Sequence, residues 1–124
     1  MMTHATRILT VDDSPSMRAL LLHALTAQGF HVEQAEDGQA ALEWLAMNEV
    51  DVVITDINMP RMDGFGLIEH LRGSARHADR PILVLSTESS DEKKQRARNA
   101  GATGWIVKPF DADKLASAVR RVTH

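Results

Sequence analysis

Acidic side chains follow two of the most apolar segments of the chain. Residues 8–11 (ILTV) run directly into Asp12 and Asp13, and residues 50–55 (VDVVIT) run into Asp56. Three carboxylates in one place repel one another by on the order of 3 kcal/mol for each pair about 5 Å apart at an effective dielectric near 20. Such a cluster stays ionised only beside a compensating cation. Oxygen ligands without His or Cys suit Mg²⁺, which also accepts phosphate oxygens.

Two further polar residues follow apolar segments later in the chain. Ser86 comes after ILVL at residues 82–85, and Lys108 comes after WIV at residues 105–107. A carboxylate can form an acyl phosphate, so Asp56 is the candidate nucleophile. Lys108 and the Ser86 hydroxyl would then hold the phosphoryl oxygens. Taken singly, Asp12, Asp13 and Ser86 are more often turn or capping residues. Asp56 alone is as often a turn residue as a nucleophile, and Lys108 alone indicates almost nothing. Only their joint occurrence favours a magnesium-dependent phosphoryl site.

The candidate site residues follow apolar segments, and the chain contains five such segments that alternate with five amphipathic ones. Strands are expected at residues 8–11, 31–36, 50–55, 82–85 and 105–107, each followed by a helix. This alternation predicts an α/β fold with a doubly wound, five-stranded parallel sheet covered by five helices on both faces. In such a sheet the carboxyl ends of the strands meet at one edge, where ligands bind.

Helix starts are marked by capping residues. Ser14 precedes Pro15, which suits a first helical turn, and Asp111 is placed to cap the last helix. Ser89 and Glu92 have the spacing of a capping box for the helix that runs to residue 100.

Length and composition indicate one domain over residues 1–124, with residues 1–6 expected to be flexible. The absence of cysteine excludes disulfides and thiolate metal sites. A formal net charge of −3 gives no reason to expect nucleic acid or an anionic membrane as a partner. No segment approaches the roughly 18 apolar residues of a membrane span, so we expect a cytoplasmic protein. We also expect it to act as a monomer.

Four stretches resemble one known family. VDDSPSMR, ITDINMPRMDG, ILVLSTESS and AGATGWIVKPF, in this order and spacing, are similar to the receiver domains of bacterial two-component response regulators. The resemblance covers essentially the whole chain and is greatest to the single-domain chemotaxis regulators of the CheY type. It implies a flavodoxin-like fold with the strand order 2-1-3-4-5 known for CheY.

The resemblance also implies a role for each residue at the strand ends. Asp56 would accept a phosphoryl group from a phosphohistidine of a CheA-like sensor histidine kinase. Mg²⁺ would be held by Asp12, Asp13, Asp56 and the backbone carbonyl of Asn58. Lys108 would contact the phosphoryl group, and a cis peptide bond is expected after it.

Further residues are implied to act in switching and in hydrolysis. Ser86 would be the switch hydroxyl, and Trp105 occupies the aromatic switch position, where Tyr or Phe is more common. Because Trp is larger and offers only an N–H donor, a static packing role for Trp105 remains an alternative. Asn58 and Glu88 occupy positions that tune access of the hydrolysing water, and their polarity predicts a short-lived phosphoryl state.

The expected output surface comprises the helix from residue 90, the strand at residues 105–107 and the last helix. Its basic side chains form either a solvated face or a docking patch for an acidic partner: Lys93, Lys94, Arg96, Arg98, Arg120 and Arg121. The partner would be a flagellar motor switch protein or a phosphatase. Alternatively, the protein would act as a phosphate sink or on another signalling protein. Direct DNA binding is not expected, because no effector domain follows.

Two other classes of protein share either the aspartyl phosphate chemistry or the topology. Phosphohydrolases of the haloacid dehalogenase type also use an aspartyl phosphate, but they place a second Asp two residues after the nucleophile, where this chain has Asn58. A nucleotide-binding module would need a glycine-rich phosphate loop, and neither G-x-G-x-x-G nor G-x-x-x-x-G-K-[ST] is present.

Overall fold

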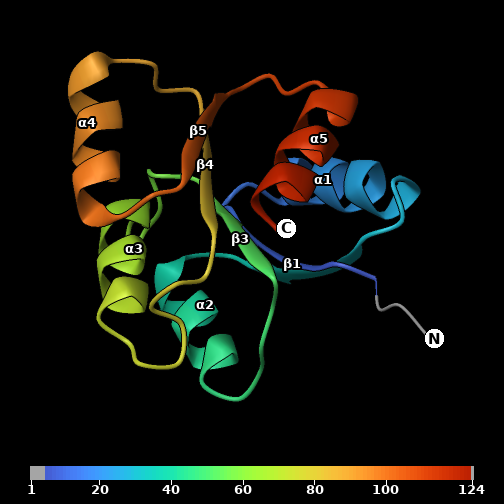
Figure 1. Cartoon of the computed structure of the whole chain (residues 1–124). Helices are drawn as coiled ribbons and strands as arrows, with labels where there is room; N and C mark the ends of the chain where they lie inside the picture. Colours follow the sequence, from blue (N-terminus) through green and yellow to red (C-terminus); the bar gives the residue numbers. More distant parts are fainter. Residues whose placement is uncertain (1–4, 124) are drawn as a thin grey trace.

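Five parallel strands form one sheet in the order β2-β1-β3-β4-β5 in the computed structural model, which describes residues 5–123 (Figure 1). The strands are β1 (Arg7–Val11), β2 (His31–Ala35), β3 (Val52–Thr55), β4 (Ile82–Ser86) and β5 (Gly104–Val107). The helices are α1 (Pro15–Ala27), α2 (Gly38–Leu45), α3 (Gly64–Arg72), α4 (Asp91–Ala100) and α5 (Ala112–Val122). The predicted α/β class, element order and strand order are confirmed.

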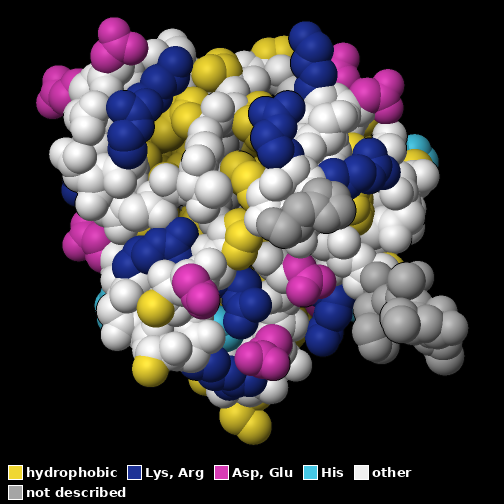
Figure 2. Space-filling view, in the orientation of Figure 1, with side chains coloured by type: hydrophobic (Ala, Val, Ile, Leu, Met, Phe, Trp, Pro, Cys, Tyr) yellow, Lys and Arg dark blue, Asp and Glu magenta, His cyan; other side chains and the backbone are white. Residues whose placement is uncertain are grey.

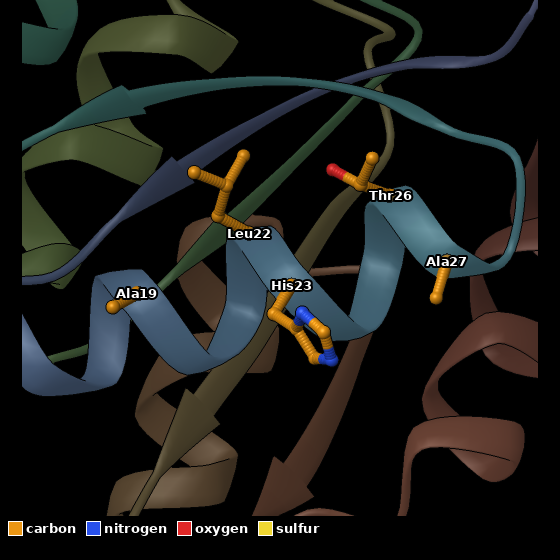
Figure 3. A pocket seen from close by; sticks show the side chains of 5 residues that line it. All are labelled: Ala19, Leu22, His23, Thr26 and Ala27. Atoms are coloured by element: carbon orange, nitrogen blue, oxygen red, sulfur yellow. The ribbon is translucent and has the colours of Figure 1, made fainter.

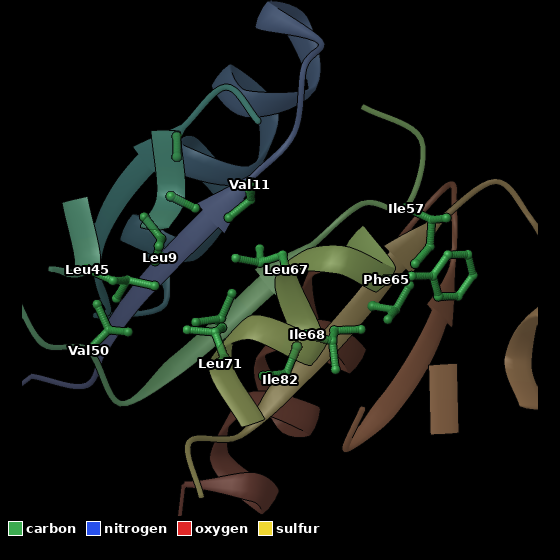
Figure 4. Close-up of a cluster of buried hydrophobic side chains, with 14 of the residues drawn as sticks. Leu9, Val11, Leu45, Val50, Ile57, Phe65, Leu67, Ile68, Leu71 and Ile82 are labelled. Atoms are coloured by element: carbon green, nitrogen blue, oxygen red, sulfur yellow. The ribbon is translucent and has the colours of Figure 1, made fainter. Parts of the chain in front are cut away.

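Helices cover both faces of the sheet. Figure 1 shows α1 and α5 on one side and α2, α3 and α4 on the other. The buried side chains accordingly form two clusters. One packs α2 and α3 against the sheet, with Leu45, Leu67 and Leu71 among its members (Figure 4). The other packs α1 and α5 against the opposite face through residues such as Leu25 and Val119.

The central strands contribute to both clusters in alternation. In β4, Ile82 and Val84 belong to the α2–α3 cluster, whereas Leu83 and Leu85 belong to the α1–α5 cluster. Successive side chains of a strand point to opposite faces, so a strand buried on both faces is apolar at nearly every position. This explains the uninterrupted run ILVL in the sequence.

The structure corrects several predicted boundaries. Strand β3 begins at Val52, although Val50 before it is also buried. Helix α4 is capped by Ser90, whose hydroxyl accepts a hydrogen bond from the Lys93 N–H, so the predicted capping box at Ser89 and Glu92 is wrong by one position. Asp91 and Glu92 instead occupy the first turn, where negative charge is favourable.

The amino-terminal segment is described only in part. Residues 1–4 of the segment expected to be flexible lie outside the described residues. The Thr6 carbonyl accepts a hydrogen bond from the His31 N–H at 2.9 Å. Within residues 5–123, no helix is long and apolar enough to cross a membrane.

An ion pair fastens the loop after β3 to the start of α2. Arg61 has a left-handed backbone, with φ of 65°, and its guanidinium donates two hydrogen bonds to Asp37 at 2.7 and 3.1 Å. Asp37 is only 3% exposed and also caps α2 by accepting from the Ala40 N–H. The Gly38 N–H donates to the Met62 carbonyl at 3.1 Å. The loop that follows Asp56 is therefore held at its far end.

The ion pair between Arg61 and Asp37 should make the free energy of unfolding depend on pH. The hydrogen bonds from Arg61 lower the pKa of Asp37. The ion pair therefore stabilises the fold above the unfolded-state pKa of about 4, and this contribution is lost as the pH falls through the lowered pKa. We expect Asp37→Asn, which keeps a capping oxygen, to lower Tm by about 4 °C at neutral pH and progressively less in acid. Thermal unfolding followed by circular dichroism measures this difference.

The matched control is Asp63→Asn. Asp63 caps α3 in the same way, through the Gly66 N–H, but it forms no ion pair with another described residue. At neutral pH Asp63→Asn should lower Tm less than Asp37→Asn does, because no ion pair is lost with it. Equal losses of Tm in the two variants would contradict a role for the Arg61 ion pair.

Candidate functional site

The three predicted acids meet at the carboxyl edge of the sheet. Asp12 and Asp13 follow β1, and Asp56 follows β3, which pairs directly with β1. Each acid places a carboxylate oxygen within 4.8 Å of one from each of the others. Asp12 is almost fully buried, and Asp13 is exposed. The cluster thus opens to solvent on one side, as a site that exchanges a cation must.

Lys108 provides the positive charge within this cluster. Its Nζ lies 2.8 Å from Asp12 Oδ2 and 2.9 Å from Asp56 Oδ2, and its side chain is only 9% exposed. Burial alone would lower the pKa of Lys108, but the hydrogen bonds to Asp12 and Asp56 outweigh it and raise the pKa. The ammonium therefore remains charged at neutral pH. The Lys108–Pro109 peptide bond is cis, as the resemblance implied.

The backbone around Asp56 fixes its carboxylate. Oδ1 accepts a hydrogen bond from the Ile57 N–H at 2.6 Å, and the Asp56 N–H donates to the Val11 carbonyl at 2.9 Å. Gly64 packs so closely on the turn that a Cβ there would lie 2.3 Å from the Asp56 carbonyl oxygen and 2.9 Å from Ile57 Cα. Only glycine fits, so the start of α3 supports the candidate nucleophile directly.

The predicted switch residues form a second group beside the acids. The Ser86 side chain is fully buried, and its Oγ accepts a hydrogen bond from the Glu88 N–H at 3.2 Å. The Lys108 N–H donates to the Ser86 carbonyl at 2.9 Å, so the two loops are joined through their backbones. The half-buried Trp105 donates its indole N–H to the Glu88 carbonyl at 3.0 Å. Glu88 thereby connects Ser86 with Trp105.

The Glu88 side chain extends this group to Asn58 and to α4. Its Oε1 lies 2.8 Å from Lys93 Nζ and 3.5 Å from Asn58 Nδ2, at the outer limit of a hydrogen bond. The hydrogen bond and charge of Lys93 lower the pKa of Glu88, which is therefore ionised at neutral pH. Sequence reasoning placed Lys93 in a basic cluster and missed this pairing. The five-residue spacing across a loop and a helix start gives no periodic signal.

The structure thus brings together Asp12, Asp13, Asp56 and Lys108 as one cluster, and Asn58, Ser86, Glu88 and Trp105 as another. Among the described residues, no hydrogen bond joins the Ser86 hydroxyl to Asp56 or to the Lys108 ammonium. An open hollow of about 550 Å³ lies elsewhere, along the exposed side of α1 (Figure 3), and its lining residues belong to neither group.

Basic side chains lie on the predicted output surface. Figure 2 shows Lys and Arg side chains at the corner of the molecule that α4 occupies. Two of them are already engaged, since Lys93 pairs with Glu88 and the Arg96 guanidinium stacks 4.0 Å from the centre of the Phe65 ring. At the end of α5, Arg120 lies over the Phe30 ring. Some of these basic side chains therefore contact other residues of the same chain and are not free to bind a partner.

This fold and this arrangement of acids around a lysine define a receiver, and residues 8–120 match the family model for the response regulator receiver domain. The chain belongs to that family. This membership favours a receiver over a phosphohydrolase or a nucleotide-binding module.

Individual relatives cover the chain to different extents. The structure of the Vibrio cholerae chemotaxis protein CheY4 is 43% identical, with a TM-score of 0.91, over 96% of this chain and 99% of that one. A response regulator structure from Chloroflexus aurantiacus is 28% identical with a TM-score of 0.93, covering 97% of this chain and 98% of that one. The response regulator MprA of Mycobacterium sp. is 39% identical over 92% of this chain. A gliding motility regulatory protein of Myxococcus xanthus is also 39% identical, over 94% of this chain. The chain spans only part of these relatives, namely 49% of the length of MprA and 15% of the length of the gliding motility protein.

Proposed function

We propose that the protein is a phosphorylation-controlled switch in which Asp56 accepts a phosphoryl group from the phosphohistidine of a sensor histidine kinase. A carboxylate oxygen of Asp56 attacks the phosphorus, the P–N bond breaks, and its electron pair returns to the imidazole. The observation that carries this proposal is the contact of Lys108 with Asp12 and Asp56 inside a cluster of three carboxylates. Phosphoryl transfer between a kinase and a receiver takes place in the cytoplasm, where we place the protein.

Magnesium suits the donor set of this site. The cluster offers only oxygen atoms, and the three acids supply them within 4.8 Å of one another. Asp12, Asp13, Asp56 and the backbone carbonyl of Asn58 would hold the ion. When bound, it neutralises charge on the phosphoryl oxygens during transfer. Lys108 contacts both buried carboxylates and supplies the second positive charge for the transferred group.

Chemical lability of the product tests the proposal. The wild-type protein is incubated with acetyl phosphate and Mg²⁺, and its intact mass is followed. We expect a gain of one phosphoryl group that is removed by hydroxylamine, as an acyl phosphate is, and no gain when EDTA is present. A label that resists hydroxylamine, or that forms equally well in EDTA, would exclude an aspartyl phosphate at a metal site.

The phosphoryl state should be short-lived, because polar side chains at the positions of Asn58 and Glu88 resemble those of the fast-responding chemotaxis regulators. Its decay after removal of the donor should be complete in well under an hour. A lifetime of several hours would contradict this.

For the output, we propose that phosphorylation changes the surface formed by α4, β5 and α5. Support comes from the contacts that lead from Ser86 through Glu88 to Trp105. The likeness to a Vibrio cholerae chemotaxis protein favours a role in chemotaxis, with a flagellar motor component as the partner. Capture experiments with the protein in beryllofluoride and Mg²⁺ test this. A motor component on the beads supports it, whereas capture of nothing favours a phosphate sink.

Trp105 should report this change in its fluorescence. If phosphorylation draws the Ser86 hydroxyl toward the acceptor, the Glu88 N–H loses its partner and the carbonyl that accepts from Trp105 moves with it. In a Trp44→Phe background, Trp105 is the remaining tryptophan. We expect beryllofluoride with Mg²⁺ to shift its emission, and Mg²⁺ alone to shift it much less. Identical spectra in the two conditions would indicate a static packing residue.

A further inference from the structure

Lys93 is the only described residue that forms an ion pair with Glu88. It stands in the first turn of α4, while Glu88 belongs to the loop that follows β4 beside the acceptor. The same oxygen, Oε1, contacts both Lys93 and Asn58. One carboxylate oxygen is thus held between a helix of the output surface and the loop that carries Asp56.

The position of the Glu88 carboxylate is electrostatically unfavourable without Lys93. The negative charge of Asp56 already acts on Glu88 in the unphosphorylated protein. Phosphorylation replaces the single negative charge of the Asp56 carboxylate with the roughly two negative charges of an acyl phosphate. Repulsion would then drive the Glu88 side chain toward solvent, since it is partly exposed. The Lys93 ammonium, 2.8 Å from Glu88 Oε1, opposes this movement by holding the carboxylate.

We propose that Lys93 is a positioning residue that keeps the Glu88 carboxylate against Asn58 and thereby restrains hydrolysis of the phosphoryl group. While the carboxylate stays in place, the two polar side chains obstruct the approach to Asp56. When it leaves, the Asn58 amide is free and water reaches the phosphorus more readily. This inference rests on the proposed function of Asp56 and adds to it a link between α4 and the lifetime of the switch.

The test is a comparison of decay rates in the 124-residue chain without any partner. After labelling with acetyl phosphate and Mg²⁺, the donor is removed and the phosphorylated fraction is followed by intact mass. Lys93→Met should decay about threefold faster than the wild type, the range expected when a partly exposed ion pair is lost. Lys93→Arg keeps the charge and the reach and should decay at close to the wild-type rate.

Two further variants separate positioning from a general effect of charge. Glu88→Gln removes the charged partner, so adding Lys93→Met to it should change the decay no further. Lys94→Met removes the same charge from the adjacent position of α4, and its decay should stay near that of the wild type. If Lys93→Met acts equally in the Glu88→Gln background, or if Lys94→Met accelerates decay as much, the proposal is wrong.

The outcomes also separate this inference from the proposed function. If the wild type takes up no phosphoryl group, the proposed function itself fails. If the wild type is labelled and Lys93→Met decays at the wild-type rate, only the role of Lys93 is excluded. Thermal unfolding of each variant, expected to match the wild type within about 2 °C, shows that the fold is intact.

Discussion

Asp56→Asn is expected to reduce labelling by acetyl phosphate and Mg²⁺ to the uncatalysed background. An amide oxygen is a far weaker nucleophile than a carboxylate, and the substitution keeps the size and shape of the side chain. Its oxygen can still accept the hydrogen bond from the Ile57 N–H. The turn should therefore persist while the chemistry is lost. Intact mass after a fixed incubation measures the difference.

The matched control for this prediction is Asp79→Asn. Asp79 is exposed and lies before β4, away from the carboxyl edge of the sheet. That variant should take up one phosphoryl group as the wild type does. If Asp56→Asn is still labelled while circular dichroism shows an intact fold, the acceptor is another residue.

Lys108→Met is expected to lower the free energy of unfolding by about 3 kcal/mol in the absence of Mg²⁺, because it leaves Asp12 and Asp56 without their buried cation. The same change should tighten Mg²⁺ binding by about tenfold, since the ion no longer meets a positive charge in the cluster. At saturating Mg²⁺ the difference in unfolding free energy from the wild type should accordingly shrink by about 1.4 kcal/mol. Chemical unfolding with and without Mg²⁺, and titration calorimetry, measure these two effects.

The exposed Lys114 provides the control for that variant. Lys114→Met should leave both the unfolding free energy and the Mg²⁺ affinity near those of the wild type. A Lys108→Met protein that binds Mg²⁺ more weakly than the wild type would contradict a site in which Lys108 and the ion face the same carboxylates.

The acids at the strand ends could be predicted because the buried strands that precede them are recognisable in the sequence as apolar runs. A strand covered on both faces is almost continuously apolar, so the first charged residue after it marks the end of the strand. Asp12 and Asp56 follow such strands, whereas Lys108 follows the short apolar run of the partly exposed edge strand β5. Their convergence at one edge required only that the strands be parallel.

The contacts that were missed depend on details that residue spacing does not encode. The Arg61 ion pair needs a left-handed backbone at a residue other than glycine, which few sequence signals indicate. The N-cap of α4 is Ser90 and not the predicted Ser89. Adjacent serines are equally able to cap, and the path of the preceding loop decides between them. The pairing of Lys93 with Glu88 depends on where α4 begins relative to that loop.

The sheet belongs to both buried clusters at once. Because Leu83 and Leu85 pack under α1 and α5 while Ile82 and Val84 pack under the helices of the other face, neither cluster can be lost without removing backbone on which the other depends. A chain divided in this way has no half that is able to remain folded alone. We therefore expect one cooperative, two-state unfolding transition, so that the stabilities of the variants above can be compared on a common scale.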